Sequence, residues 1–152
     1  MKKAIASLLT AALTSSVLIS CDRNEKGAPL RPDTYVLVHG AWQAPYVWDE
    51  VRSELEQRGN KVIIVELPGH GNDQTATHML NLDVYRDKVI QAIPDETDKV
   101  ILVGHSMAGM VISAVGEKIP SRVIKLEYVG AFLPTNGQPL TDVAESDPDS
   151  KL

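Results

Sequence analysis

The decisive stretch of this 152-residue chain is Val100-Ile101-Leu102-Val103-Gly104-His105-Ser106-Met107-Ala108-Gly109. Its four leading apolar residues predict a buried strand, and a helix is expected over residues 107–119. Ser106 stands at the sharp reversal between the two. Such a turn presses together the positions two before and two after the serine, and the small residues Gly104 and Ala108 occupy them. The pattern therefore predicts a strand-turn-helix that lifts one hydroxyl out of the sheet.

Strands and helices are expected to alternate from residue 34 to residue 134. Further apolar runs predict strands at 35–38, at 61–67 and within 123–133. Because these runs do not alternate polar with apolar residues, they favour a parallel sheet whose strands are buried on both faces. Apolar residues recur at helical spacing in the gaps, namely Val47, Val51 and Leu55, then Leu82, Tyr85, Val89 and Ile93, then Met110, Val111, Ala114, Val115 and Ile119. We therefore predict an α/β fold, with right-handed crossovers and helices covering the sheet.

Residues 1–20 have the pattern of a removable signal peptide. Two lysines precede the uncharged apolar segment 4–19, which is short for a membrane span of roughly 20 apolar residues. The segment runs into Leu18-Ile19-Ser20-Cys21, which resembles the lipobox of bacterial lipoproteins. We therefore expect lipidation of Cys21, attachment to a membrane of the bacterial cell envelope, and a tether over residues 21–33. The alternative is a secretory signal that merely contains a cysteine.

The composition argues against several kinds of partner. The chain has 15 Lys and Arg against 20 Asp and Glu, and two of the lysines lie in the expected signal peptide. We expect no binding to nucleic acid, because an acidic surface repels phosphates. Cys21 is the one cysteine, so the chain has no intrachain disulfide and no cysteine metal cluster. His70 and Asp73 lack a third ligand nearby, which favours a capping role in their loop over a metal site; we expect no cofactor.

Ser106 is the candidate catalytic nucleophile. The alternative is a serine that only caps the following helix. Acyl transfer also needs N–H donors aimed at the developing oxyanion. Met107 is expected to supply one donor at the start of the helix. The loop after the first strand is expected to supply the other from Ala41, or instead from Trp42, since Gly40 lets that loop fold close to the serine; the alternative is an ordinary glycine turn.

Four motifs together resemble the α/β-hydrolase superfamily, particularly its methylesterase, hydroxynitrile lyase and bacterial esterase branch. They are Val-Leu-Val-His-Gly-Ala (36–41), Leu-Pro-Gly-His-Gly (67–71), Gly-His-Ser-Met-Ala-Gly (104–109) and Ala-Phe-Leu-Pro (131–134). Ala108 departs from the strict G-x-S-x-G pattern, a change that this branch tolerates. The resemblance implies that residues 34–134 form the N-terminal part of a hydrolase domain. Residues 135–152 would be the start of a lid region or a disordered tail.

The resemblance also implies a catalytic acid and a histidine that come later in the chain than the nucleophile. No histidine follows Ser106 in this sequence. His39 belongs to the expected oxyanion loop, His70 to the Pro-Gly-His-Gly turn and His78 to a polar loop, while the side chain of His105 is expected to point away from the serine. We therefore expect the chain as given to lack the acid and the base, and to show little or no turnover.

Three functions remain open from the sequence. The first is a serine hydrolase that acts on small carboxylic esters through an acyl-enzyme on Ser106. The second is a shortened, non-catalytic remnant that binds small apolar acyl compounds. The third is a carbon–carbon lyase like the hydroxynitrile lyases. Trp42 and His105 are the candidate pocket residues; Tyr46 and Trp48 are further candidates, although packing of a helix accounts equally well for Trp48.

Replacement of the expected lipidation site tests membrane attachment. Cys21→Ala removes the only thiol, so the protein should leave the membrane fraction and appear in the soluble fraction of the cell envelope. Fractionation followed by immunoblotting measures this shift. Unchanged membrane association of the Cys21→Ala protein would refute lipidation.

Overall fold

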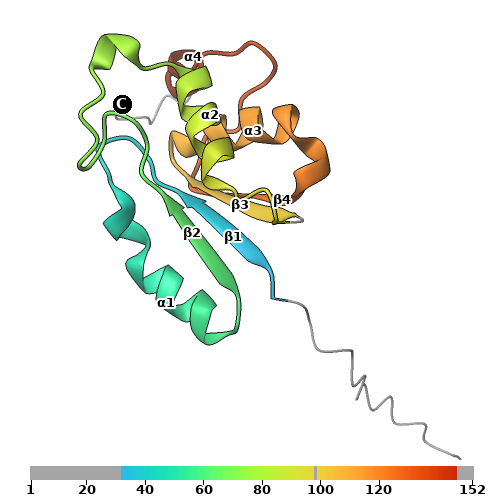
Figure 1. The fold of residues 1–152 in the computed structure, drawn as a ribbon. Coiled ribbons are helices and arrows are strands. Elements are labelled where there is room, and N and C mark those ends of the chain that lie inside the picture. Colours follow the sequence, from blue (N-terminus) through green and yellow to red (C-terminus); the bar gives the residue numbers. More distant parts are fainter. Residues whose placement is uncertain (1–31, 98, 147–152) are drawn as a thin grey trace, which may run out of the picture. The chain divides into compact units, whose positions relative to one another are not determined.

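The computed structural model describes residues 32–97 and 99–146, which form a four-stranded parallel sheet with helices on both faces (Figure 1). The strands lie in the order β2 (Lys61–Val65), β1 (Thr34–Val38), β3 (Val100–His105) and β4 (Val123–Val129). Every neighbouring pair is parallel, so the carboxyl ends of all four strands meet at one edge. The chain leaves β1 toward one side and leaves β3 toward the other. The carboxyl ends of β1 and β3 therefore flank the switch point, where open α/β sheets bind ligands.

The connections between strands are helical, as the periodicity predicts. They comprise a 3₁₀ turn (Pro45–Trp48) and α1 (Asp49–Gln57) between β1 and β2, a 3₁₀ turn (Thr77–Met79) and α2 (Leu82–Ala92) between β2 and β3, and α3 (Ala108–Lys118) and a 3₁₀ turn (Pro120–Arg122) between β3 and β4. A further helix, α4 (Leu140–Glu145), follows β4. Figure 1 shows α1 on one face of the sheet and α2 and α3 on the other. The predicted α/β architecture is confirmed.

Two apolar clusters hold the helices to the sheet. Val36 and Val38 of β1 face α2 and α3, where Val89 and Val111 meet them in the larger cluster. Leu37 faces the opposite way and joins the smaller cluster with Trp48, Ile101 and Val103. Successive residues of β1 are thus buried on opposite faces, as the unbroken apolar run predicts. Trp48 is 6% exposed, so packing accounts for this side chain rather than a substrate pocket.

The last strand, β4, is an uncovered apolar edge, as its place at the end of the four predicted strands leads one to expect. Ile124 is 55% exposed and Val129 is 45% exposed, although both belong to an apolar run. The reason is topological, because β4 is an edge strand that pairs only with β3 in the sheet. An exposed apolar edge of this kind is a site where further chain can add.

The helix boundaries follow the local signals closely. The side chain of Asn81 accepts a hydrogen bond from the N–H of Val84 at 3.0 Å, which confirms the predicted N-cap of α2. Gly59 ends α1 in the left-handed region, at φ 85°. The predicted apolar stripe of α1 is wrong at Val51, which is 40% exposed. Val47 and Leu55 pack on the sheet instead, together with Trp48.

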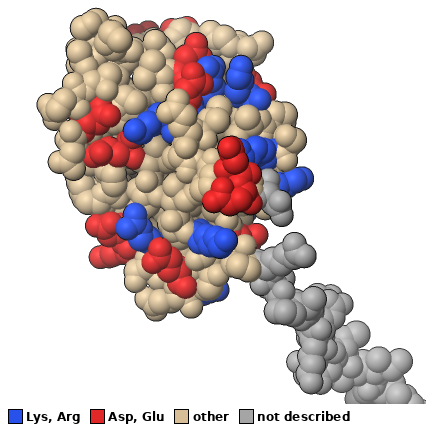
Figure 2. All heavy atoms as spheres, in the orientation of Figure 1, with Lys and Arg blue, Asp and Glu red and all other residues tan. Residues whose placement is uncertain are grey.

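The expectations about nucleic acid and membranes can be compared with the surface charge and the helices of the described residues. Figure 2 shows acidic and basic side chains interspersed on the visible face, without a gathered basic patch. Within residues 32–97 and 99–146, no helix has the length and apolar character needed to cross a membrane. The expected signal peptide, Cys21 and all of the tether before Pro32 lie outside the described residues.

A substitution at Gly109 should loosen the packing that follows the serine turn. A Cβ added at Gly109 would overlap the carbonyl oxygen of Phe132, a backbone atom that cannot move aside alone. We expect Gly109→Ala to lower the free energy of unfolding by roughly 1–3 kcal/mol, as overpacking does. Urea denaturation of the protein measures the change.

Gly116 on the same helix is the matched control. The three atoms nearest to a Cβ there all belong to the Leu126 side chain, the closest at 3.3 Å, and alanine also favours helix. Gly116→Ala should therefore stay within about 1 kcal/mol of the wild type. Equal destabilisation by the two alanines would contradict the assigned contact.

Candidate active site

Ser106 lies in a strained turn directly after β3. Its φ is 55°, in the left-handed region that residues other than glycine rarely adopt. Two backbone N–H groups, from Gly109 and Phe132, donate to its carbonyl oxygen at 3.1 Å each. A Cβ on Gly104 would lie 2.8 Å from the carbonyl oxygen of Ala108, which explains the need for glycine two residues before the serine. The predicted sharp reversal is therefore present, and backbone contacts hold it.

The loop after β1 packs directly on this turn. A Cβ added at Gly40 would lie 2.9 Å from the Cβ of Ser106 and 3.1 Å from the carbonyl oxygen of His105. Only glycine permits this approach without displacing the serine. Trp42 in the same loop also has a positive φ, 54°. Strained residues of this kind concentrate at functional sites, and here two of them lie on the two loops that meet at the switch point.

Three polar groups at the junction of these loops are free to meet a ligand. Within the described residues, the Ser106 hydroxyl and the N–H groups of Ala41 and Met107 take part in no hydrogen bond. Met107 is the N-cap residue of α3, so its N–H lies at the positive end of the helix dipole. Within the described residues the Ser106 hydroxyl accepts no hydrogen bond from an N–H of α3, so a capping role does not account for this serine.

Gln43 also belongs to this junction, although no sequence motif marks it as a site residue. Its side-chain oxygen accepts a hydrogen bond from the N–H of Gly40 at 3.0 Å. The same oxygen lies 2.8 Å from Nδ1 of His105, the residue before the serine. The only signal in the sequence was a long amide side chain three residues after the loop glycine. Such a residue is unremarkable until the sheet order places His105 beside it.

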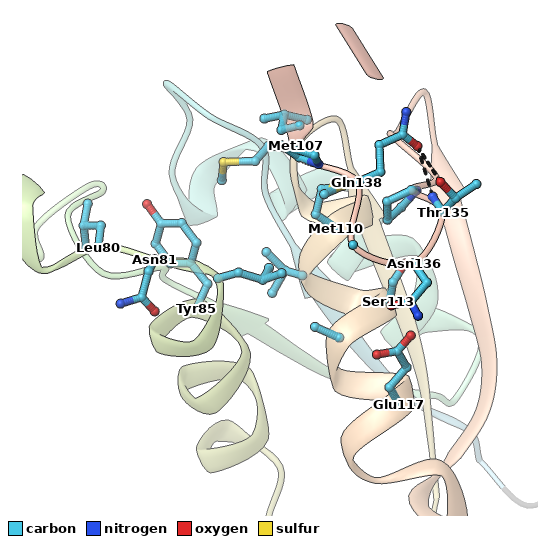
Figure 3. A pocket seen from close by; sticks show the side chains of 17 residues that line it. Leu80, Asn81, Tyr85, Met107, Met110, Ser113, Glu117, Thr135, Asn136 and Gln138 are labelled. Carbon is cyan, nitrogen blue, oxygen red and sulfur yellow. Dashed lines mark hydrogen bonds between the residues drawn. The ribbon is translucent and has the colours of Figure 1, made fainter. Parts of the chain in front are cut away.

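The candidate pocket residues lie in separate surroundings. Trp42 is 86% exposed and lines a cavity of about 490 Å³ with Tyr46 and His70. His105 is directed at Gln43. Another cavity, of about 600 Å³, lies between α2, α3 and residues 134–140, with Met107 and Tyr85 in its wall. Figure 3 shows that both apolar side chains, such as Met107 and Met110, and polar ones, such as Asn136, line it, with the carboxylate of Glu117 at one end.

Comparison with known proteins identifies the fold family. A family model described as "Alpha/beta hydrolase family" matches residues 35–146. The chain belongs to the alpha/beta hydrolase family. The resemblance drawn from the four motifs is thereby confirmed.

The curated relatives of this alpha/beta hydrolase include esterases. It is 34% identical over 111 residues to the carbendazim hydrolyzing esterase of Nocardioides sp. (strain SG-4G), covering 70% of this chain and 45% of the relative. It is 33% identical over 109 residues to methylesterase 7 of Arabidopsis thaliana, covering 69% of this chain and 42% of the relative. The chain thus spans less than half the length of these two curated relatives.

Solved structures show the same architecture. An extracellular alpha/beta-hydrolase from a Paenibacillus species matches with a TM-score of 0.64 and 33% identity, over 75% of this chain and 49% of that one. Polyneuridine aldehyde esterase matches with a TM-score of 0.68 and 27% identity, over 76% of this chain and 47% of that one. Proteins named as esterases thus occur both among the curated relatives and among the solved structures.

The remaining histidines of the alpha/beta hydrolase have backbone or ring contacts of their own. His39 is fully buried, its Nε2 accepts from the N–H of Leu67 at 3.2 Å, and its Nδ1 therefore carries the proton that it donates to the Gly40 carbonyl at 2.9 Å. Nδ1 of His70 bonds the Pro68 carbonyl at 3.0 Å, and its ring contacts those of His39 and Tyr85. No hydrogen bond among the described residues joins a histidine to Ser106.

Asp73 supports the loop that carries His70. One of its carboxylate oxygens accepts from the N–H groups of Gly69, at 2.9 Å, and Thr75, at 2.8 Å. The hydrogen bond from Gly69, followed by those from Thr75, lowers the pKa of Asp73 to about 2. These contacts match the capping role that the spacing of His70 and Asp73 favours.

Burial of His39 should make the stability of the alpha/beta hydrolase depend on pH. Burial lowers the pKa of His39 below its ordinary value, and a protonated ring would lose its bond from Leu67. Above pH about 6.5 the folded and unfolded chains both hold this ring neutral, and its contribution to stability is complete. As the pH falls below that value, the unfolded chain binds a proton that the folded chain refuses, so the free energy of unfolding falls.

Urea denaturation between pH 7.5 and 5 measures this effect, where both limits lie about one pH unit or more from the ordinary histidine pKa. His39→Gln should reduce the fall in the free energy of unfolding between pH 7.5 and 5. His78→Gln, at an exposed position, should leave that fall unchanged. If the unfolding free energy of His39→Gln falls with pH as much as that of the wild type, other groups cause the pH dependence.

Proposed function

We propose that this protein is a serine esterase that hydrolyses small carboxylic esters through an acyl-enzyme on Ser106. The observation that carries the proposal is the packing of Gly40 against the strained Ser106, with the serine hydroxyl left unbonded among the described residues. Backbone strain and close loop contact present a hydroxyl at the edge of the sheet where α/β enzymes bind substrates. The esterases among the relatives support the same chemistry.

The proposed reaction assigns a separate task to each group. The Ser106 oxygen attacks the ester carbonyl carbon while a general base takes the hydroxyl proton. The N–H groups of Ala41 and Met107 donate to the oxyanion that forms on the carbonyl oxygen. The alcohol leaves with a proton, and a water molecule then attacks the acyl-enzyme to release the carboxylic acid and restore Ser106.

The base is proposed to come from a part of the hydrolase fold that residues 32–146 do not include. His39 and His70 are bound to backbone groups, and His105 is turned toward Gln43. The curated relatives extend well beyond the matched region, since this chain covers 45% and 42% of two of them. A non-catalytic acyl-binding remnant is the second candidate, favoured by the missing contact between Ser106 and any described histidine.

Trp42 is proposed to line the substrate site at its open side. Its ring is almost fully exposed on the loop that carries the proposed oxyanion donor, and it lines one cavity with Tyr46 of the following 3₁₀ turn, which is 66% exposed. Exposed aromatic rings next to a polar reaction centre suit an ester with an apolar group.

We further propose that lipidated Cys21 attaches the protein to a membrane of the bacterial cell envelope.

Labelling with a fluorophosphonate tests the proposed nucleophile. The protein expressed from its complete gene should take up one label per chain, and the adduct should map to the peptide that contains Ser106 by mass spectrometry. Ser106→Ala should take up none, whereas Ser113→Ala should be labelled like the wild type. Ser113 is a suitable control because its hydroxyl already bonds the Gly109 carbonyl and the Tyr128 hydroxyl.

The same probe separates the two candidate functions. Residues 22–152 expressed alone should not be labelled if, as proposed, the activating base lies outside residues 32–146. Failure of the complete protein to react at Ser106 would refute the esterase and leave the acyl-binding remnant. Stoichiometric labelling of residues 22–152 alone would show that the base lies within them.

A further inference from the structure

One side-chain atom joins the two loops of the candidate site. The oxygen Oε1 of Gln43 lies 3.0 Å from the backbone nitrogen of Gly40 and 2.8 Å from Nδ1 of His105. Gly40 follows β1 and His105 is the last residue of β3, so the amide bridges the two strand ends at the switch point. Both bonds are partly buried, where a lost partner is more costly than at the surface.

The bond from Gly40 determines the direction of the bond to His105. A backbone N–H only donates, so the atom of Gln43 that faces Gly40 is the carbonyl oxygen and not the amide nitrogen. An oxygen only accepts, and Nδ1 of His105 must therefore carry a proton. The neutral ring then has its proton on Nδ1 and an unprotonated Nε2. The geometry thus specifies one tautomer of the residue next to the nucleophile.

The contact also determines where the oxyanion loop lies. A Cβ at Gly40 would be 2.9 Å from the Cβ of Ser106, so the loop has no room to approach further. The bonds to Gln43 prevent the loop from moving away. Trp42 reverses the chain with a positive φ, which brings the side chain of residue 43 back to residue 40. Ala41, the proposed oxyanion donor, is part of this closed turn.

We propose that Gln43 is a positioning residue, which ties the oxyanion loop to the nucleophile turn and keeps His105 protonated on Nδ1. Its catalytic consequence rests on the proposed function of Ser106. Gln43 itself touches no reacting atom in this scheme. It acts by holding the N–H of Ala41 at a constant distance from the serine, and small displacements of such donors reduce rates strongly.

The tautomer of His105 provides a test that does not depend on activity. Long-range ¹H–¹⁵N spectra of the histidine-labelled protein, expressed from its complete gene, should show the Nδ1–H form of His105 in the wild type. Gln43→Met keeps the length of the side chain but removes the acceptor, so this preference should be lost. Gln43→Glu keeps an acceptor oxygen and should retain protonated Nδ1. Gln57→Met, at an exposed position on α1, should leave the His105 signals unchanged.

The rate of fluorophosphonate labelling at Ser106 tests the effect on the reaction. Gln43→Met should label about tenfold more slowly than the wild type, because two hydrogen bonds that hold the oxyanion loop are lost. Gln57→Met should label at the wild-type rate. A Gln43→Met protein that labels as fast as the wild type would overturn the positioning role.

The tautomer spectra and the labelling rates together distinguish failure of this inference from failure of the proposed function. An Nε2–H tautomer in the wild type, or an unchanged Nδ1–H signal in Gln43→Met, would refute the contact whether or not Ser106 reacts. If no variant is labelled, the esterase proposal fails, and the tautomer comparison still decides whether Gln43 holds the two loops together.

Discussion

The contact between Gly40 and Ser106 is the constraint on which the site depends. Two loops that follow adjacent parallel strands meet so closely that a single added carbon would collide with the serine. Ser106 and Trp42 both adopt left-handed backbone, at a cost of order 1–3 kcal/mol each. The surrounding core has to supply this energy. It does so through strands β1 and β3, whose central residues are buried on both faces of the sheet.

Glycines on three elements make this close packing possible. Gly40 admits the serine, Gly104 admits the backbone of Ala108, and Gly109 admits the segment at Phe132. The nearest neighbour of each glycine is a backbone atom or the nucleophile itself, which leaves little scope for adjustment. The segment 131–132 is thus part of the support of the turn, because the Phe132 N–H also donates to the Ser106 carbonyl. The nucleophile turn is braced from β1 on one side and from the chain after β4 on the other.

Polar groups at the site are organised by the backbone rather than by ion pairs. His39 is kept neutral between a donor and an acceptor of the main chain, and Asp73 is held by two N–H groups of its own loop. Gln43 extends this arrangement to the junction of the two loops. These hydrogen bonds fix the loops that carry the proposed oxyanion donors. Acyl transfer requires such donors to be held in place before charge develops on the oxyanion.

The sequence by itself determined the alternation of strands and helices, the sharp turn at Ser106 and the N-cap at Asn81, because each depends on residues close in the chain. Its apolar runs also indicated that the last strand is an uncovered edge, but they did not reveal that Val51 faces solvent, since the exposure of a helix face depends on which elements become its neighbours. Only the tertiary structure joined Gln43 to His105, which are 62 residues apart. The physical reason is that a hydrogen bond across a sheet edge requires the strand order, and local patterns do not encode that order.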